Sequence, residues 1–197
     1  GAPNYRLFKT DAANPSRGDW REIIPQTGAK LEQAVFVAGR IFASYLENAS
    51  SRLREHDADG ALLREIELPG IGTVYGVGGE WRGSELFFGF TSFFTPPAVY
   101  RLDVAANRTG LYDRVVAPVD SARYAVEQVW CRSKDGTRVP MFVVRGKDAP
   151  RDGSAPTILY GYGGFDISMT PAFSKTVIPW LEMGGIYAVA NIRGGGE

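Results

Sequence analysis

The stretch Tyr160-Gly161-Tyr162-Gly163-Gly164-Phe165 does most to decide the fold of this chain of 197 residues. It follows an apolar run over 157–160, and we expect that run to be a strand. After the glycines we expect a helix that opens at 170–173, with Thr170 as its cap, and ends at Gly184. A second apolar strand is expected over 186–190. Strand, helix and strand in this order predict a βαβ unit with two parallel strands.

The sequence before residue 120 has a different pattern, in which short alternating strands are separated by polar turns. The tripeptides Tyr5-Arg6-Leu7, Ser51-Arg52-Leu53 and Tyr100-Arg101-Leu102 each open an expected strand that leads through a turn into another. Their period of roughly 45 to 50 residues is near that of a four-stranded propeller blade. A β-propeller is therefore the favoured architecture, and an unrelated run of hairpins in a sandwich is the alternative.

Composition excludes several classes of protein. Lys and Arg number 22 and Asp and Glu also number 22, so the chain lacks the basic surplus that binding to nucleic acid needs. It has no apolar run of about 20 residues, so no membrane span is expected. The single cysteine, Cys131, cannot form an internal disulfide, and we expect it to be a packing residue. We expect a cytoplasmic protein, with the periplasm as the alternative.

The Gly-rich stretch begins like a dinucleotide-binding loop, but Asp166 stands where that motif needs its third glycine. The better interpretation places it after a central strand of an α/β-hydrolase, where this loop supplies donors to the oxyanion hole. The hydroxyl of Tyr162 is a candidate donor because a phenol, with a pKa of about 10, stays protonated near neutral pH.

Two segments, 160–165 and Ala190-Asn191-Ile192-Arg193-Gly194-Gly195-Gly196-Glu197, closely resemble the prolyl oligopeptidase family of serine peptidases. Residues 133–142 resemble the hairpin that enters the family's hydrolase domain, and parts of 56–93 resemble its late propeller blades. The resemblance implies β-propeller blades followed by the start of an α/β-hydrolase domain. Residues 1–119 would be the C-terminal part of the propeller, and residues 120–197 the N-terminal part of the catalytic domain.

The resemblance also implies roles for two aromatic residues. Tyr162 matches the tyrosine whose hydroxyl joins a backbone N–H in the family's oxyanion hole, and Phe165 matches an aromatic beside the bound proline. The structural alternative for both is core packing at a strand end. For Arg193 to Glu197 we favour a tight structural turn over an anion-binding nest.

The catalytic triad is expected to lie downstream of this chain, which contains no Gly-x-Ser-x-Gly elbow. Ser154, Ser168 and Ser174 lie in loops or near the expected helix, and the only histidine, His56, is in the β-rich part, where a structural role is expected. The segment alone is therefore expected to be inactive.

The resemblance implies a parent enzyme that hydrolyses short peptides on the carboxyl side of proline through an acyl-enzyme. One alternative is the sister oligopeptidase that cleaves after Lys or Arg, and another is a non-catalytic propeller binding module. No metal or organic cofactor is implied. The expected partners are a proline-containing oligopeptide and the remainder of the same polypeptide, with no nucleic acid and no membrane.

Overall fold

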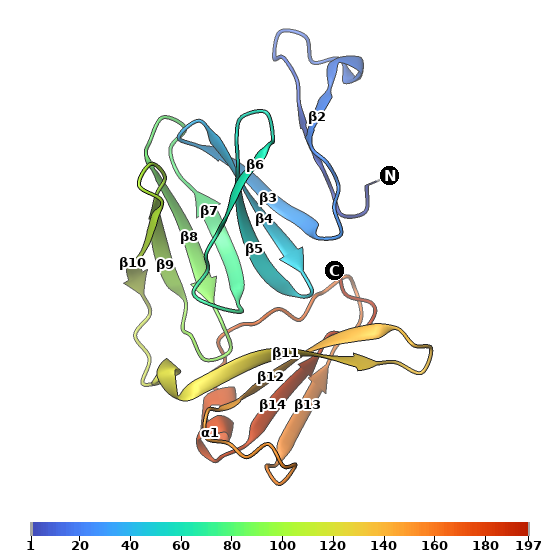
Figure 1. The fold of residues 1–197 in the computed structure, drawn as a ribbon, viewed down its shortest axis with the longest axis vertical. Coiled ribbons are helices and arrows are strands. Elements are labelled where there is room, and N and C mark those ends of the chain that lie inside the picture. The colour runs from blue at the N-terminus through green and yellow to red at the C-terminus, as the bar shows by residue number, and fades with distance from the viewer. Residues whose placement is uncertain (1, 197) are drawn as a thin grey trace.

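The computed structural model describes residues 2–196, which form three four-stranded sheets and one short hairpin (Figure 1). Two antiparallel sheets stand together in the upper half of the view, and the third sheet lies beneath them with the helix α1. The elements are β1 (Leu7–Lys9), η1 (Arg17–Asp19), β2 (Arg21–Ile24), β3 (Lys30–Val37), β4 (Arg40–Glu47), β5 (Ser50–His56), β6 (Leu62–Ile66), β7 (Thr73–Gly78), β8 (Glu85–Thr91), β9 (Ala98–Asp103), β10 (Arg108–Arg114), η2 (Ser121–Arg123), β11 (Tyr124–Arg132), β12 (Arg138–Gly146), β13 (Thr157–Gly161), α1 (Val177–Glu182) and β14 (Ile186–Ala190).

The first two large sheets, β3–β6 and β7–β10, each run antiparallel in sequence order, as the four strands of a propeller blade do. Their tight turns follow from local sequence: Ala38 and Gly39 both have positive φ, which suits the two-residue turn between β3 and β4. The sheets pack face to face around a core of large apolar side chains that includes Phe42, Leu86 and Phe88, all fully buried. Burial of these side chains is the main force that holds the two sheets together.

Two of the three repeated tripeptides lie at equivalent places in the four-stranded sheets. Ser51-Arg52-Leu53 lies in β5 and Tyr100-Arg101-Leu102 lies in β9, each of which is the third strand of its sheet. Tyr5-Arg6-Leu7 leads into β1, which pairs with β2 in a hairpin beside the β3–β6 sheet (Figure 1). Ser51-Arg52-Leu53 and Tyr100-Arg101-Leu102 therefore mark the third strand of a four-stranded sheet, whereas Tyr5-Arg6-Leu7 does not.

The third sheet is mixed, with the order β11-β12-β14-β13. β12 and β14 are antiparallel, whereas β13 and β14 are parallel with Gly161 opposite Ala190, as the expected strand, helix and strand required. The sheet is fastened to the blades by a second core, in which Phe93 from the end of β8 packs against Phe142 of β12 with ring centroids 5.6 Å apart. The four-stranded antiparallel sheets and the mixed sheet thus share an apolar core.

The helix is shorter than the sequence predicts. It begins at Val177 and not at 170–173, and Thr176 rather than Thr170 precedes it. The reason is tertiary: the carbonyl of Pro171 accepts a 2.7 Å bond from the Thr73 hydroxyl, and the Phe173 amide donates to the Thr91 hydroxyl. These bonds from the β7–β10 sheet hold the segment out of the helical conformation. Within residues 2–196, no helix has the length and apolar character needed to cross a membrane.

Candidate functional site

Two Gly-rich loops meet at one edge of the mixed sheet. The first follows β13 and carries 161–166, and the second follows β14 and carries 191–196. Because β13 and β14 are parallel, their carboxyl ends lie at the same edge, so the two loops emerge side by side. Ligand sites in sheets with parallel strands commonly form at this edge.

Tyr162 lies in the first loop, one residue after the end of β13, and its side chain is half-buried. Its hydroxyl is 3.8 Å from the point where a Cβ on Gly164 would lie, so the ring folds back over its own loop. A bulkier residue at 164 would stand beside the hydroxyl. The Tyr162 hydroxyl therefore lies beside Gly164.

Phe165 combines two costly features. Its side chain is 91% exposed, and its backbone has a φ of +55°, followed by +59° at Asp166. A left-handed backbone is disfavoured for a bulky residue and persists only where the surroundings impose it. Here the Asp166 amide donates to the Gly194 carbonyl and the Ile167 amide donates to the Gly164 carbonyl, both at 3.1 Å. The loop thus holds a large apolar ring outward instead of packing it into the core.

The second loop packs directly against the first. A Cβ on Gly163 would lie 2.2 Å from the Arg193 carbonyl oxygen, and one on Gly194 would lie 2.7 Å from Gly163. Gly194 also has a φ of +103°. Close packing accounts for these glycines, which supports the structural interpretation of 193–196; Glu197 lies outside the described residues.

The Arg193 side chain leaves the loops and reaches the hairpin turn between β11 and β12. It forms an ion pair with Asp135 and has longer contacts of 3.4 Å to the Ser133 hydroxyl and 3.5 Å to the Thr137 hydroxyl. Hydrogen bonds from Arg193 and Thr137 hold the pKa of the Asp135 carboxyl far below its usual range. The Arg193 contact therefore favours the charged form of the Asp135 carboxyl.

Residues distant in sequence also reach these loops. The Lys30 ammonium at the start of β3 lies 3.9 Å from the Asp166 carboxylate. A Cβ on Gly196 would lie 2.8 Å from the same ammonium nitrogen. No sequence signal pointed to Lys30 or to Asp135, because only the fold brings β3 and the β11–β12 hairpin to the loops.

Among the other candidate residues, Ser168 is hydrogen-bonded to the second loop, whereas His56, Ser154 and Ser174 have their partners elsewhere. His56 is buried in β5, where its Nδ1 lies 2.9 Å from the Gly60 carbonyl oxygen and its Nε2 lies 3.4 Å from the Tyr45 hydroxyl, as a structural role predicts. Ser154 bonds Asp152, Ser174 bonds Thr176, and the Ser168 hydroxyl accepts from the Gly196 amide. The described residues contain no group of three or more His, Cys, Asp or Glu side chains placed to hold a metal ion.

The prediction that Cys131 is a packing residue is wrong, because the side chain is exposed. It lies near the end of β11, where the hairpin with β12 extends past the part of the sheet that pairs with β14. No other layer covers the strand there, so residue type alone was a poor guide to burial.

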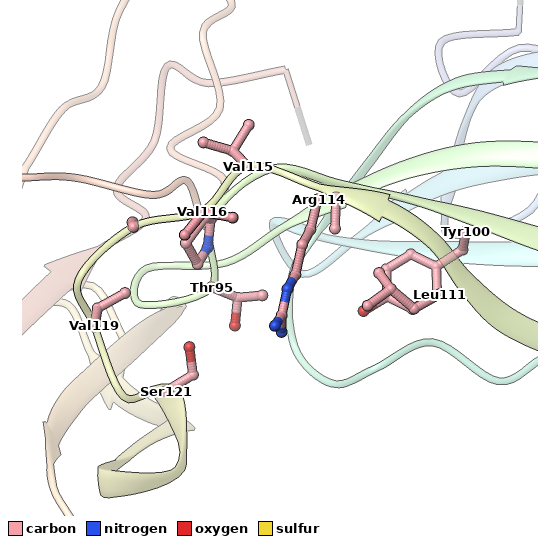
Figure 2. A pocket seen from close by; sticks show the side chains of 11 residues that line it. Thr95, Tyr100, Leu111, Arg114, Val115, Val116, Val119 and Ser121 are labelled. Carbon is pink, nitrogen blue, oxygen red and sulfur yellow. The ribbon is translucent and has the colours of Figure 1, made fainter.

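A hollow of about 280 Å³ lies where the β7–β10 sheet passes into η2 (Figure 2). Figure 2 shows the Arg114 side chain pointing into it between Thr95 and Leu111. Neither Tyr162 nor Phe165 lines this hollow, so it is distinct from the two-loop site.

Known proteins resemble the chain throughout its length. Residues 1–114 match the family described as "Prolyl oligopeptidase, N-terminal beta-propeller domain". The prolyl endopeptidase of Elizabethkingia miricola is 42% identical over 196 residues, and prolyl oligopeptidase A of Galerina marginata is 35% identical over 202 residues. These matches cover the whole chain but only 28% and 27% of those relatives, so the chain spans little more than a quarter of their length.

Solved structures agree with the sequence comparisons. A prolyl endopeptidase structure superposes with a TM-score of 0.86 at 44% identity, covering 98% of this chain and 29% of that one. Prolyl oligopeptidase B of Galerina marginata, in its apo form, superposes with a TM-score of 0.87 at 31% identity, covering 99% of this chain and 28% of the other. The propeller-type sheets, the two-loop edge and these matches lead to one conclusion: the chain belongs to the prolyl oligopeptidase family.

Proposed function

We propose that this chain is part of a longer serine endopeptidase that hydrolyses short peptides on the carboxyl side of proline. The observation that carries the proposal is 42% identity with a prolyl endopeptidase across the whole chain. In this proposal residues 1–119 end the propeller domain and residues 120–197 begin an α/β-hydrolase domain. The mixed sheet with its parallel pair β13 and β14 supports that division.

Tyr162 is the proposed oxyanion donor. Its hydroxyl would donate a hydrogen bond to the negative oxygen of the tetrahedral intermediate, and loss of one such donor typically lowers the rate by about 10²- to 10³-fold. Two features support this role: the residue follows a strand whose carboxyl end lies beside that of its parallel neighbour, and its side chain is only half-buried.

Phe165 is proposed to form one wall of the pocket for the substrate proline. A flat apolar surface suits a pyrrolidine ring, and an exposed aromatic ring held in a left-handed conformation is a feature of binding sites rather than of cores. We expect the sister specificity, for Lys or Arg, to need an acidic pocket that these two loops do not supply, since Asp166 is already opposite Lys30.

The nucleophile, base and orienting acid are proposed to lie in the remainder of the polypeptide. The serine would attack the peptide carbonyl to form an acyl-enzyme, which water then hydrolyses. All five residues of β13 are exposed here, including Leu159. We propose that the remainder of the chain covers this sheet edge, and that the segment alone is inactive.

The test is hydrolysis of a blocked Gly-Pro amide by the full-length protein, with a Gly-Arg amide beside it. We expect cleavage of the proline substrate only. In the same protein Tyr162→Phe should lower kcat about 10²- to 10³-fold with little change in KM. Tyr160→Phe, a matched loss of a phenolic hydroxyl two residues away in β13, should leave kcat near that of the parent.

Two results would contradict the proposal. Cleavage of the Gly-Arg amide alone would assign the protein to the sister specificity. A Tyr162→Phe variant as active as Tyr160→Phe would remove the oxyanion role, whatever the substrate preference.

A further inference from the structure

We propose that Arg193 and Asp135 are positioning residues: their ion pair fixes the second Gly-rich loop to the β11–β12 hairpin, and that loop holds Tyr162 in its working position. The inference rests on the proposed function, because it concerns the same oxyanion donor. It assigns a role to a hairpin turn that contributes no side chain to the two-loop site itself.

The backbones of the two Gly-rich loops are in direct contact. The backbone of the second loop is packed so tightly on the first that Gly163 has no room for a Cβ, and the Gly194 carbonyl accepts the Asp166 amide at 3.1 Å. The Gly196 amide donates to the Ser168 hydroxyl at 3.1 Å. These contacts begin directly after Tyr162 and lie on both sides of Phe165, so a shift of residues 193–196 would move the first loop as well.

The turn between β11 and β12 holds the Arg193 side chain. The guanidinium of Arg193 is held by Asp135, and the Asp135 carboxylate is itself oriented by the Thr137 amide at 3.1 Å. The turn is closed by two bonds between Ser133 and its neighbours: the Ser133 amide donates to the Thr137 carbonyl and the Gly136 amide donates to the Ser133 carbonyl, both at 2.9 Å. This turn closes a nine-pair antiparallel ladder between β11 and β12, which connects it to the mixed sheet.

The Arg193–Asp135 ion pair is expected to affect catalysis more than folding. Both side chains are about half exposed or more, and ion pairs in water contribute little to global stability. Arg193 is nevertheless the only residue of 193–196 with a side chain beyond a hydrogen atom, so its guanidinium is the one side-chain group of that stretch that can reach the hairpin. A displacement of about 1 Å at a catalytic group can cost on the order of 100-fold in rate.

The experiment uses the full-length protein and a blocked Gly-Pro amide. The variants are Asp135→Asn, Arg193→Gln and Arg193→Lys, alone and in the Tyr162→Phe background. Glu85→Gln is the matched control, because Glu85 and Arg101 form an exposed ion pair at 3.2 Å on the β7–β10 sheet. Thermal unfolding of each variant is measured beside kcat and KM.

We expect Asp135→Asn and Arg193→Gln to lower kcat by about tenfold or more at nearly unchanged KM, with melting temperatures like that of Glu85→Gln. Arg193→Lys should have a higher kcat than Arg193→Gln because lysine keeps the positive charge. It should have a lower kcat than the parent because lysine lacks the planar guanidinium group. In the Tyr162→Phe background the same changes should alter kcat by less than about twofold, because they act through a hydroxyl that is already gone. A merely structural pair would not show this dependence on the background.

Three results would overturn the inference. The first is an Asp135→Asn variant with the kcat of the Glu85→Gln control while Tyr162→Phe is impaired; this removes the positioning role and leaves the proposed function standing. The second is a loss that is equally large with and without the Tyr162 hydroxyl. The third is an unchanged kcat in Tyr162→Phe, which refutes the oxyanion role and the positioning role together.

Discussion

Replacement of Gly163 by alanine tests the idea that the two loops are shaped by backbone contact. A Cβ at this position would lie 2.2 Å from the Arg193 carbonyl oxygen and 2.7 Å from Ile192 Cγ1, whereas ordinary contact begins at 3.4 Å. The carbonyl oxygen is backbone and cannot rotate away as a side chain can. The loops must therefore separate by about 1.2 Å, the difference between 3.4 and 2.2 Å.

The expected cost has two parts. Overpacking of a filled site costs roughly 1–3 kcal/mol, and we expect a loss of that size in the free energy of unfolding of the full-length protein. A separation of this size next to Tyr162 should also lower kcat on a blocked Gly-Pro amide by about 10- to 100-fold.

Gly161→Ala is the matched control, because the nearest atom to its Cβ is 3.5 Å away and the contact is ordinary. Both glycines lie within three residues of each other, and neither has the positive φ that would strain an alanine. We expect Gly161→Ala to stay within about 0.5 kcal/mol of the parent. Equal losses in the two variants, or an unimpaired Gly163→Ala, would refute the reasoning.

The remaining predictions concern packing and acid stability. Phe142→Ala should lower the free energy of unfolding by about 3–5 kcal/mol in urea denaturation, because Phe142 is fully buried against Phe93, whereas Phe165→Ala, an exposed ring, should change it by less than about 0.5 kcal/mol. The pKa of Asp135 is lowered in the folded state, so its stabilisation is present above the ordinary value of 3.8 and is lost only as the pH falls below it toward the folded pKa. Carboxyl chemical shifts by NMR should show Asp135 still ionised at a pH where other Asp side chains have titrated, and a midpoint near 3.8 would contradict the Arg193 contact.

Much of the fold could be predicted from the sequence because its signals are local. The alternating strands and the spacing of the repeated tripeptides follow from a few neighbouring residues. The parallel pairing of β13 and β14 likewise follows from a strand, a Gly-rich turn, a helix and a second strand in close succession. The two glycine segments also indicated the family before any contact was known.

The candidate site could be predicted only in part. The sequence by itself determined which loop carries Tyr162 and Phe165 and that glycines surround them. The roles of these two residues stay predictions until activity is measured. The sequence did not show that Asp135 and Lys30 reach the same loops, since they are 58 and 163 residues from Arg193 and no local pattern connects them.

Tertiary contacts decided the rest. Thr73 and Thr91 capture the segment before Val177 and shorten the helix, although Thr170 and Pro171 are good residues for a helix start. Cys131 is exposed because its strand extends beyond the sheet that would cover it. Local propensities are worth only tenths of a kcal/mol to about 1 kcal/mol per residue, so a few hydrogen bonds or contacts from distant strands outweigh them. Those contacts exist only once the chain has folded.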